Sequence, residues 1–140
     1  MAGFLIAMLS GALMSIQGTF NTGVTKASSI WVAAGFVQLT AFATCLIMWL
    51  VNGRPQIMGL FTVTPKIVLL GGVIGAFITY TVIQAISSLG VAKAEIVIVI
   101  SQIAVAYVIE LLGLFGSEKA AFSWVKVLGI GMSIAGVIVF

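Results

Sequence analysis

Apolar residues follow one another along this chain in five long blocks, separated by short polar stretches. The blocks cover residues 3–24, 30–51, 66–87, 91–112 and 121–140. A helix rises 1.5 Å per residue, so about 20 apolar residues cross the hydrocarbon core of a bilayer. We therefore predict an all-α integral membrane protein, in which residues 1–140 form one domain of five transmembrane helices.

The stretches between the blocks carry helix-start and turn signals. Ser29 is a candidate N-cap for the second helix, and Thr64 is one for the third, with Pro65 at the first helical position. The only long loop, residues 52–65, is expected either to lie in the membrane interface or to act as a gating segment. The link at residues 88–90 is so short that we expect the third and fourth helices to be antiparallel neighbours.

Composition supports the membrane assignment and restricts the chemistry. Hydrophobic residues make up 62% of the chain and charged residues only 6%, whereas soluble domains carry about 25% charged residues. The six basic residues are dispersed, which argues against nucleic-acid binding. There is no histidine, and the single cysteine lies inside an apolar block, so neither a metal site nor a catalytic constellation is expected. We predict no enzyme activity and no cofactor.

The distribution of basic residues bears on orientation in the cell membrane. Five helices place the termini on opposite sides, with Arg54, Lys66, Lys119 and Lys126 on the N-terminal side and Lys26 and Lys93 on the other. This four-to-two bias weakly favours a cytoplasmic N-terminus and leaves room for both orientations to coexist. The first block has no basic flank or cleavage signal, so we interpret it as a permanent helix in a multi-pass inner or plasma membrane protein.

Helix one carries uncharged polar residues along one side. Ser10, Met14, Gln17 and Asn21 fall within about 60° of one another at 100° per residue. Beside them runs a stripe of small residues: Gly3, Ala7, Gly11, Ser15, Gly18 and Thr22. The polar face indicates either a cavity-lining helix or interhelical hydrogen bonding that holds the bundle together. The small stripe indicates packing within the subunit or a dimer seam.

The fourth helix carries a second polar face. Glu95 and Gln102 are seven residues apart and lie on the same side, separated by about 10 Å along the axis. Glu95 either faces a cavity, where it can hold a proton or an organic cation, or lies at headgroup level beside water. Glu110 is interpreted as an end-of-span anchor or packing partner, with a coupling role as the alternative. The secondary candidates are Gln38, Tyr80, Gln84 and Ser101.

Several short motifs follow one another over the whole chain: residues 11–17 with Asn21, residues 70–76, Leu89-Gly90, Ser101-Gln102, residues 109–116, and Lys126, Gly129 and Gly136. Their order and spacing resemble those of the half-size, YdcZ-like branch of the drug/metabolite transporter superfamily. Two positions depart from the family pattern: Glu110 stands where relatives often have Asp, and Glu95 where they are usually apolar. The second departure weakens a general coupling role for Glu95.

The resemblance implies five-helix subunits that pair, in several relatives antiparallel, into a ten-helix transporter with its substrate site near the midplane. Together with the polar faces, it predicts a secondary transporter that exports a small metabolite or organic cation by alternating access. The partners would be lipid, a second identical or homologous subunit, and the substrate. Gln17, Asn21 and Gln102 would contact the substrate, with Glu95 as charge partner. The alternatives are a non-transporting scaffold or regulatory subunit, and a channel.

Overall fold

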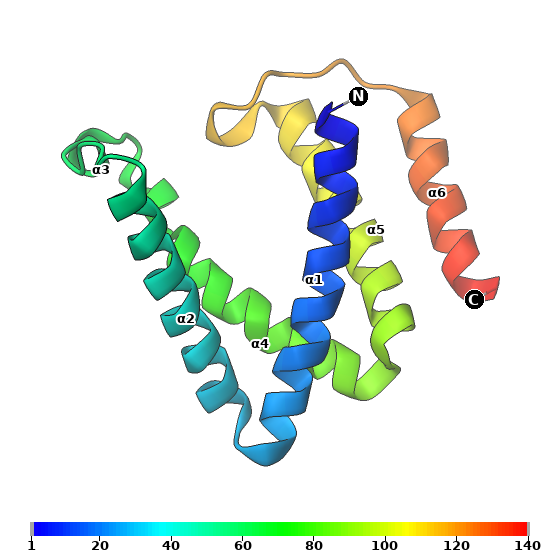
Figure 1. The fold of residues 1–140 in the computed structure, drawn as a ribbon. Coiled ribbons are helices and arrows are strands. Elements are labelled where there is room, and N and C mark those ends of the chain that lie inside the picture. The colour runs from blue at the N-terminus through cyan, green and yellow to red at the C-terminus, as the bar shows by residue number, and fades with distance from the viewer. Residues whose placement is uncertain (1, 140) are drawn as a thin grey trace. The chain divides into compact units, whose positions relative to one another are not determined.

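A computed structural model describes residues 2–139, which form helices joined by short connections (Figure 1). The elements are α1 (Ala2–Ala27), α2 (Ile30–Val51), α3 (Gly59–Thr62), the 3-10 turn η1 (Lys66–Leu70), α4 (Gly71–Leu89), α5 (Val91–Leu112), the 3-10 turn η2 (Leu114–Gly116) and α6 (Trp124–Val139). The chain divides into two compact units, one ending at Ser87 and the other beginning at Ser88. Each unit is described separately below.

The predicted spans correspond to these helices, but the bounds of the first, third and fifth differ. Four segments are long and apolar enough to cross a membrane: Ala2–Ala27, Ile30–Val51, Lys66–Leu89 and Val91–Leu112. The first extends three residues beyond its predicted end, through Lys26, whose charge is favourable in the last turn of a helix. The predicted fifth span is shorter, because α6 begins at Trp124 rather than at residue 121; position 140 lies outside the described residues.

The helix-start signals have mixed outcomes. The Ser29 N-cap is confirmed, because its side-chain oxygen accepts a hydrogen bond of 3.3 Å from the Val32 backbone N–H. The N-cap predicted at Thr64, with Pro65 as the first helical residue, is wrong, although the span begins at Lys66 as predicted. Pro65 has extended backbone angles and stands before the helix, which opens as a 3-10 turn at Lys66 without a side-chain cap. The apolar run is continuous here, so its composition did not reveal the change from 3-10 to α geometry.

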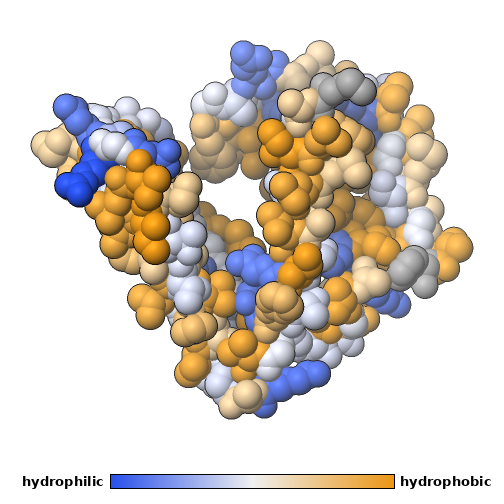
Figure 2. Space-filling model, in the orientation of Figure 1, coloured by the Kyte–Doolittle hydropathy of each residue, from blue (hydrophilic) through white to orange (hydrophobic). Residues whose placement is uncertain are grey.

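Large apolar side chains lie mainly on the outside of the chain, as Figure 2 shows for one face. The residues buried in the first unit include Ala33, Ala34, Ile83 and Ile86. In water this distribution would expose far more apolar surface than a soluble protein carries. In a bilayer the same surface faces acyl chains, so the arrangement fits lipid as the solvent.

Small residues bring α1 and α2 together in the first unit. Gly18 and Thr22 are buried on α1, and Ala33 and Ala34 are buried on α2, with Ala33 fully inaccessible. Apolar side chains gain little by leaving lipid, so close backbone approach is what favours contact between helices in a membrane. The C-terminal half of the small-residue stripe on α1 therefore packs within the subunit, while Gly3, Ala7 and Gly11 are exposed.

The second unit is organised by the turn after α5. Gly113 ends this helix in the left-handed conformation, with φ of 64°, and its N–H is directed at the carbonyls of Ile109 and Glu110. A side chain here would be strained, and a Cβ would lie 3.4 Å from the Cβ of Lys119. The Ala120 N–H also donates to the Glu110 carbonyl at 2.9 Å, so the connection folds back onto the end of α5 before α6 begins.

Candidate functional site: polar groups within the membrane helices

Asn21 is the most enclosed of the predicted substrate-contacting residues. Only 7% of its surface is exposed, yet its side-chain amide forms no hydrogen bond with any residue in the range 2–139. Gln17, one turn earlier on α1, is exposed and also unpaired within that range. No side-chain N or O atom of the described residues is both buried and unpaired, so the polar atoms of these two amides are open at the surface of the chain. Within a membrane such open amides need a partner, which can be water, a ligand or another chain.

Hydroxyl groups on α1 differ from the amides, because their own helix satisfies them. Ser10 donates to the carbonyl of Ile6 at 2.9 Å, and Thr22 and Thr25 donate to the carbonyls four residues earlier at the same distance. Met14, the remaining member of the predicted polar face, is exposed. Of this face, the amides of Gln17 and Asn21 are the groups with unused donors and acceptors.

On α5, Glu95 is half-buried and Gln102 is exposed. Neither residue lines the two grooves between α5 and α6 that are described below. Ser101 does line one of them, but its hydroxyl donates to the Val97 carbonyl at 3.0 Å. The face shared by Glu95 and Gln102 is thus not part of the wall of either groove.

Three of the secondary candidates take part in contacts within the first unit. The Gln38 amide donates to the Thr79 hydroxyl at 3.4 Å, linking α2 to α4. Tyr80 stacks on the Trp31 ring with centroids 4.7 Å apart, and its hydroxyl accepts a bond of 3.4 Å from Gln84. A Cβ on Gly75 would lie 3.5 Å from the Gln38 amide nitrogen, so a small residue here leaves room for that amide. The bond of Gln38 to Thr79 and the stacking of Tyr80 on Trp31 join α2 to α4. They leave Gln38 and Tyr80 less free to bind a solute.

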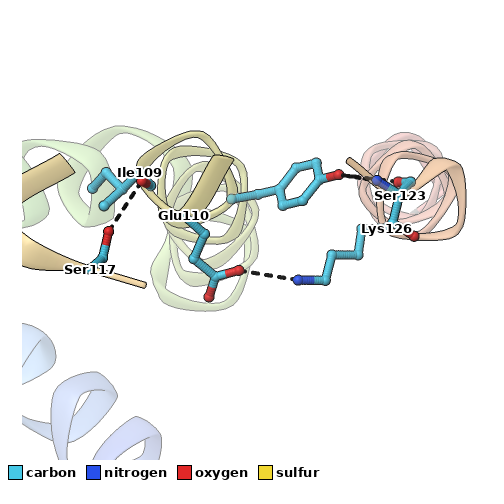
Figure 3. A network of polar contacts seen from close by, with 6 residues as sticks. Ile109, Glu110, Ser117, Ser123 and Lys126 are labelled. Atoms are coloured by element: carbon cyan, nitrogen blue, oxygen red, sulfur yellow. Dashed lines mark hydrogen bonds and ion pairs between the residues drawn. The ribbon is translucent and has the colours of Figure 1, made fainter. Parts of the chain in front are cut away.

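Two polar contacts join α5 to α6 and the residue before it, and Figure 3 shows them together. The Lys126 ammonium lies 3.1 Å from the Glu110 carboxylate and 5.2 Å from the centroid of the Tyr107 ring. The Tyr107 hydroxyl accepts a 2.7 Å bond from the Ser123 N–H and donates to the Ser123 carbonyl at 3.2 Å. Tyr107 is buried, whereas the two charged side chains are about half exposed. The contact of Glu110 is that of a packing partner between helices.

The ion pair lies at one end of a groove of about 460 Å³. Its lining residues are Ile103, Ala106, Tyr107, Glu110, Lys126, Gly129, Ile130 and Ser133. A second groove of about 360 Å³ also lies between α5 and α6 and is lined almost wholly by apolar residues. Gly129 and Ser133, one turn apart on α6, therefore face α5 and form part of the groove wall.

A comparison with families of known proteins matches one family over residues 2–139, described as "Putative inner membrane exporter, YdcZ". The match covers nearly the whole chain. The chain belongs to this family. In the corresponding comparisons, no curated protein and no solved structure matches it. The resemblance noted in the sequence is thereby confirmed, and the protein is an inner-membrane member of the YdcZ family with several helices able to span a bilayer.

For this YdcZ-family chain, sequence reasoning did not assign the α5–α6 contacts. Tyr107 was not among the candidates, and Lys126 entered only through the resemblance and the charge count. A signal was present, however. Tyr107 and Glu110 are three residues apart, as are Ser123 and Lys126, so each pair lies on one face of the chain near the same turn. Two polar pairs with matching spacing on either side of a short loop indicate a contact between the helices.

The Tyr107 hydroxyl is expected to stabilise the start of α6. In Tyr107→Phe, the Ser123 N–H and carbonyl both lose their side-chain partner, which should lower the free energy of unfolding by about 1–2 kcal/mol. Unfolding in mixed micelles, followed by circular dichroism, measures the change. Tyr80→Phe is the matched control, because among residues 2–139 its hydroxyl takes part only in a 3.4 Å bond with Gln84. Equal stability losses in the two variants would contradict this role of Tyr107.

Proposed function

We propose that this protein is a secondary transporter that moves a small metabolite or organic cation outward across the inner membrane. The family description supports export, and the apolar helices fit a multi-pass protein. The polar amides of α1 and α5 would bind this solute during transport.

Asn21 carries this proposal. The residue is more than nine-tenths buried, but the polar atoms of its amide reach the surface of the chain and form no hydrogen bond within residues 2–139. A scaffold helix gains stability by pairing such an amide with a neighbouring helix, as Gln38 does with Thr79. A transporter instead keeps donors and acceptors free for its solute. Gln17 extends the same polar face by one turn, and Gln102 with Glu95 supplies a second face on α5.

We further propose that two copies pair in opposite orientations. Five helices leave the termini on opposite sides, and the weak charge bias permits insertion both ways. An antiparallel pair contains two inverted halves, which is the arrangement that many alternating-access transporters use around a site near the midplane. In such a pair the unpaired faces of α1 and α5 from two copies would enclose the solute.

Solid-supported membrane electrophysiology on reconstituted protein tests the function. Cations, anions and neutral metabolites would be applied in turn at two pH values. We expect a saturable transient current for one solute class, which becomes pH-dependent if protons are the coupling ion. Currents that rise without saturation would instead indicate a channel. Silence across the panel from folded, dimeric protein would favour a scaffold or regulatory subunit.

Gln102 is expected to contribute to solute binding without contributing to the fold. It is exposed on α5 and makes no side-chain hydrogen bond within residues 2–139. Gln102→Ala should lower the flux at subsaturating solute about tenfold, the effect of losing one hydrogen bond whose partner stays desolvated. The matched control is Gln56→Ala, which removes an exposed amide from the connection between α2 and α3. Unchanged flux in Gln102→Ala would remove this residue from the site.

A further inference from the structure

The groove between α5 and α6 begins at the C-terminal end of α5 and the N-terminal end of α6, and it extends from there toward the membrane interior. Glu110 lies two residues before the last residue of α5, and Lys126 lies two residues after the first residue of α6. At the other end of the groove, Ile103 lies seven residues before Glu110 on α5, and Ser133 lies seven residues after Lys126 on α6. Seven helical residues correspond to about 10 Å. The charged end is therefore near headgroup level, and the apolar end is at the depth of the upper acyl chains.

Both charges in the groove remain open to a ligand. The exposed fractions of the Lys126 and Glu110 side chains are 51% and 48%, and the bond between them is the only hydrogen bond that either side chain makes within residues 2–139. Lys126 thus has two N–H donors to spare, and the second carboxylate oxygen of Glu110 has no partner there. A ligand with both a donor and an acceptor can bind this pair without separating it.

From this arrangement we infer that the α5–α6 groove binds one phospholipid whose headgroup carries both a primary ammonium and a phosphate. The ammonium would donate to Glu110 and the phosphate would accept from Lys126. One acyl chain would lie along Ile103, Ala106 and Ile130. A net-neutral headgroup on a net-neutral ion pair satisfies both charges, and the apolar wall matches the chain below them.

Other occupants fit these observations less well. A transported solute is expected near the midplane, whereas this groove opens at headgroup level. A helix from a second copy would have to offer polar partners to both charges, or cover them at a cost in desolvation. A purely anionic headgroup would bind Lys126 but would be repelled by Glu110. A quaternary ammonium lacks the N–H donors that the carboxylate accepts.

Native mass spectrometry of the full-length protein tests the inference independently of transport. The protein would be titrated in detergent with phosphatidylethanolamine, phosphatidylcholine and phosphatidylglycerol of identical acyl chains. We expect one phosphatidylethanolamine per chain to be retained about tenfold more tightly than the other two lipids, as losing one charge-assisted hydrogen bond implies. This comparison uses the unaltered protein, so it does not depend on any variant folding.

Two substitutions then locate the bound lipid. Glu110→Gln should remove the preference for phosphatidylethanolamine over phosphatidylcholine, and Lys126→Gln should weaken retention of all three lipids. Glu118→Gln and Lys119→Gln, which change exposed charges in the adjacent loop, are the matched controls and should retain the preference. Equal retention of the three lipids by the unaltered protein would overturn the inference. The inference would also be overturned by a Glu110→Gln variant that keeps the preference. A Glu110→Gln variant in which only the monomer–dimer equilibrium changes would overturn it too, because that result would place a second copy of the chain in the groove.

Discussion

Replacing Asn21 by leucine is expected to abolish saturable transport while the protein folds at least as stably as before. Leucine has the same number and branching of side-chain heavy atoms as asparagine and lacks both hydrogen-bonding groups of the amide. Because the Asn21 amide makes no hydrogen bond within residues 2–139, its removal breaks no bond in the isolated chain. The same change deprives a bound solute of its hydrogen bonds. A loss of one hundredfold or more in flux is the order expected when a site built around polar groups loses them.

Two measurements separate these effects. Transient currents on reconstituted variants report transport, and unfolding in mixed micelles reports stability. Thr19→Val is the matched control on α1, because Thr19 is exposed and its hydroxyl donates to the Ser15 carbonyl of its own helix. Full transport in Asn21→Leu, together with raised stability, would show that the amide contacts no solute. Loss of stability would instead mean that Asn21 pairs with another chain in the assembly.

Ala33→Leu is expected to give the largest loss of stability of any substitution considered for this chain. Ala33 has no exposed surface and lies on α2, which packs against α1. Three additional carbon atoms at this position must either separate the two helices or force strained rotamers. Overpacking of this kind costs typically 1–3 kcal/mol, and we expect the upper part of that range, about 3 kcal/mol, because small residues are what permit this contact.

The neighbouring Gly35→Leu provides a control on the same helix. A Cβ built at Gly35 has no atom within 4 Å, so the new side chain extends into lipid. Leucine is also the better helix former, so stability should stay the same or rise slightly. Unfolding midpoints of the two variants in the same micelles make the comparison. A Gly35→Leu variant as unstable as Ala33→Leu would indicate that this side of α2 also packs against protein, as a dimer seam would.

The helices themselves were predictable, because span length and hydropathy are properties of continuous sequence. The bounds of α2 and α5 agree with the predicted 30–51 and 91–112. The start of α6 was not predictable in this way. Residues 121–123 are apolar or small and continue the hydrophobic block, but the Tyr107 hydroxyl holds the Ser123 backbone from the preceding helix. A contact made across sixteen residues has no trace in local composition.

The candidate site shows the same limit. Helical periodicity placed Ser10, Gln17 and Asn21 on one side of α1, and that follows from 100° per residue alone. It could not tell that Asn21 is buried while Gln17 is exposed, because burial depends on where α2 approaches. Periodicity also could not show which polar side chains are already hydrogen-bonded within their own helix and which are not. Ser10 bonds the carbonyl of Ile6 within its own helix, whereas an amide of Gln17 or Asn21 needs a partner from elsewhere.

The hydroxyl bonds within α1 affect how this helix can move. Ser10, Thr19, Thr22 and Thr25 each donate to a carbonyl four residues earlier, and within residues 2–139 no side chain of α1 forms a hydrogen bond with another element. Separating α2 from α4 breaks the bond between Gln38 and Thr79, and separating α5 from α6 breaks an ion pair. Sliding α1 along α2 exchanges only van der Waals contacts between small residues. Shear displacement of α1 therefore breaks no side-chain hydrogen bond to another helix, unlike separation of α2 from α4 or of α5 from α6.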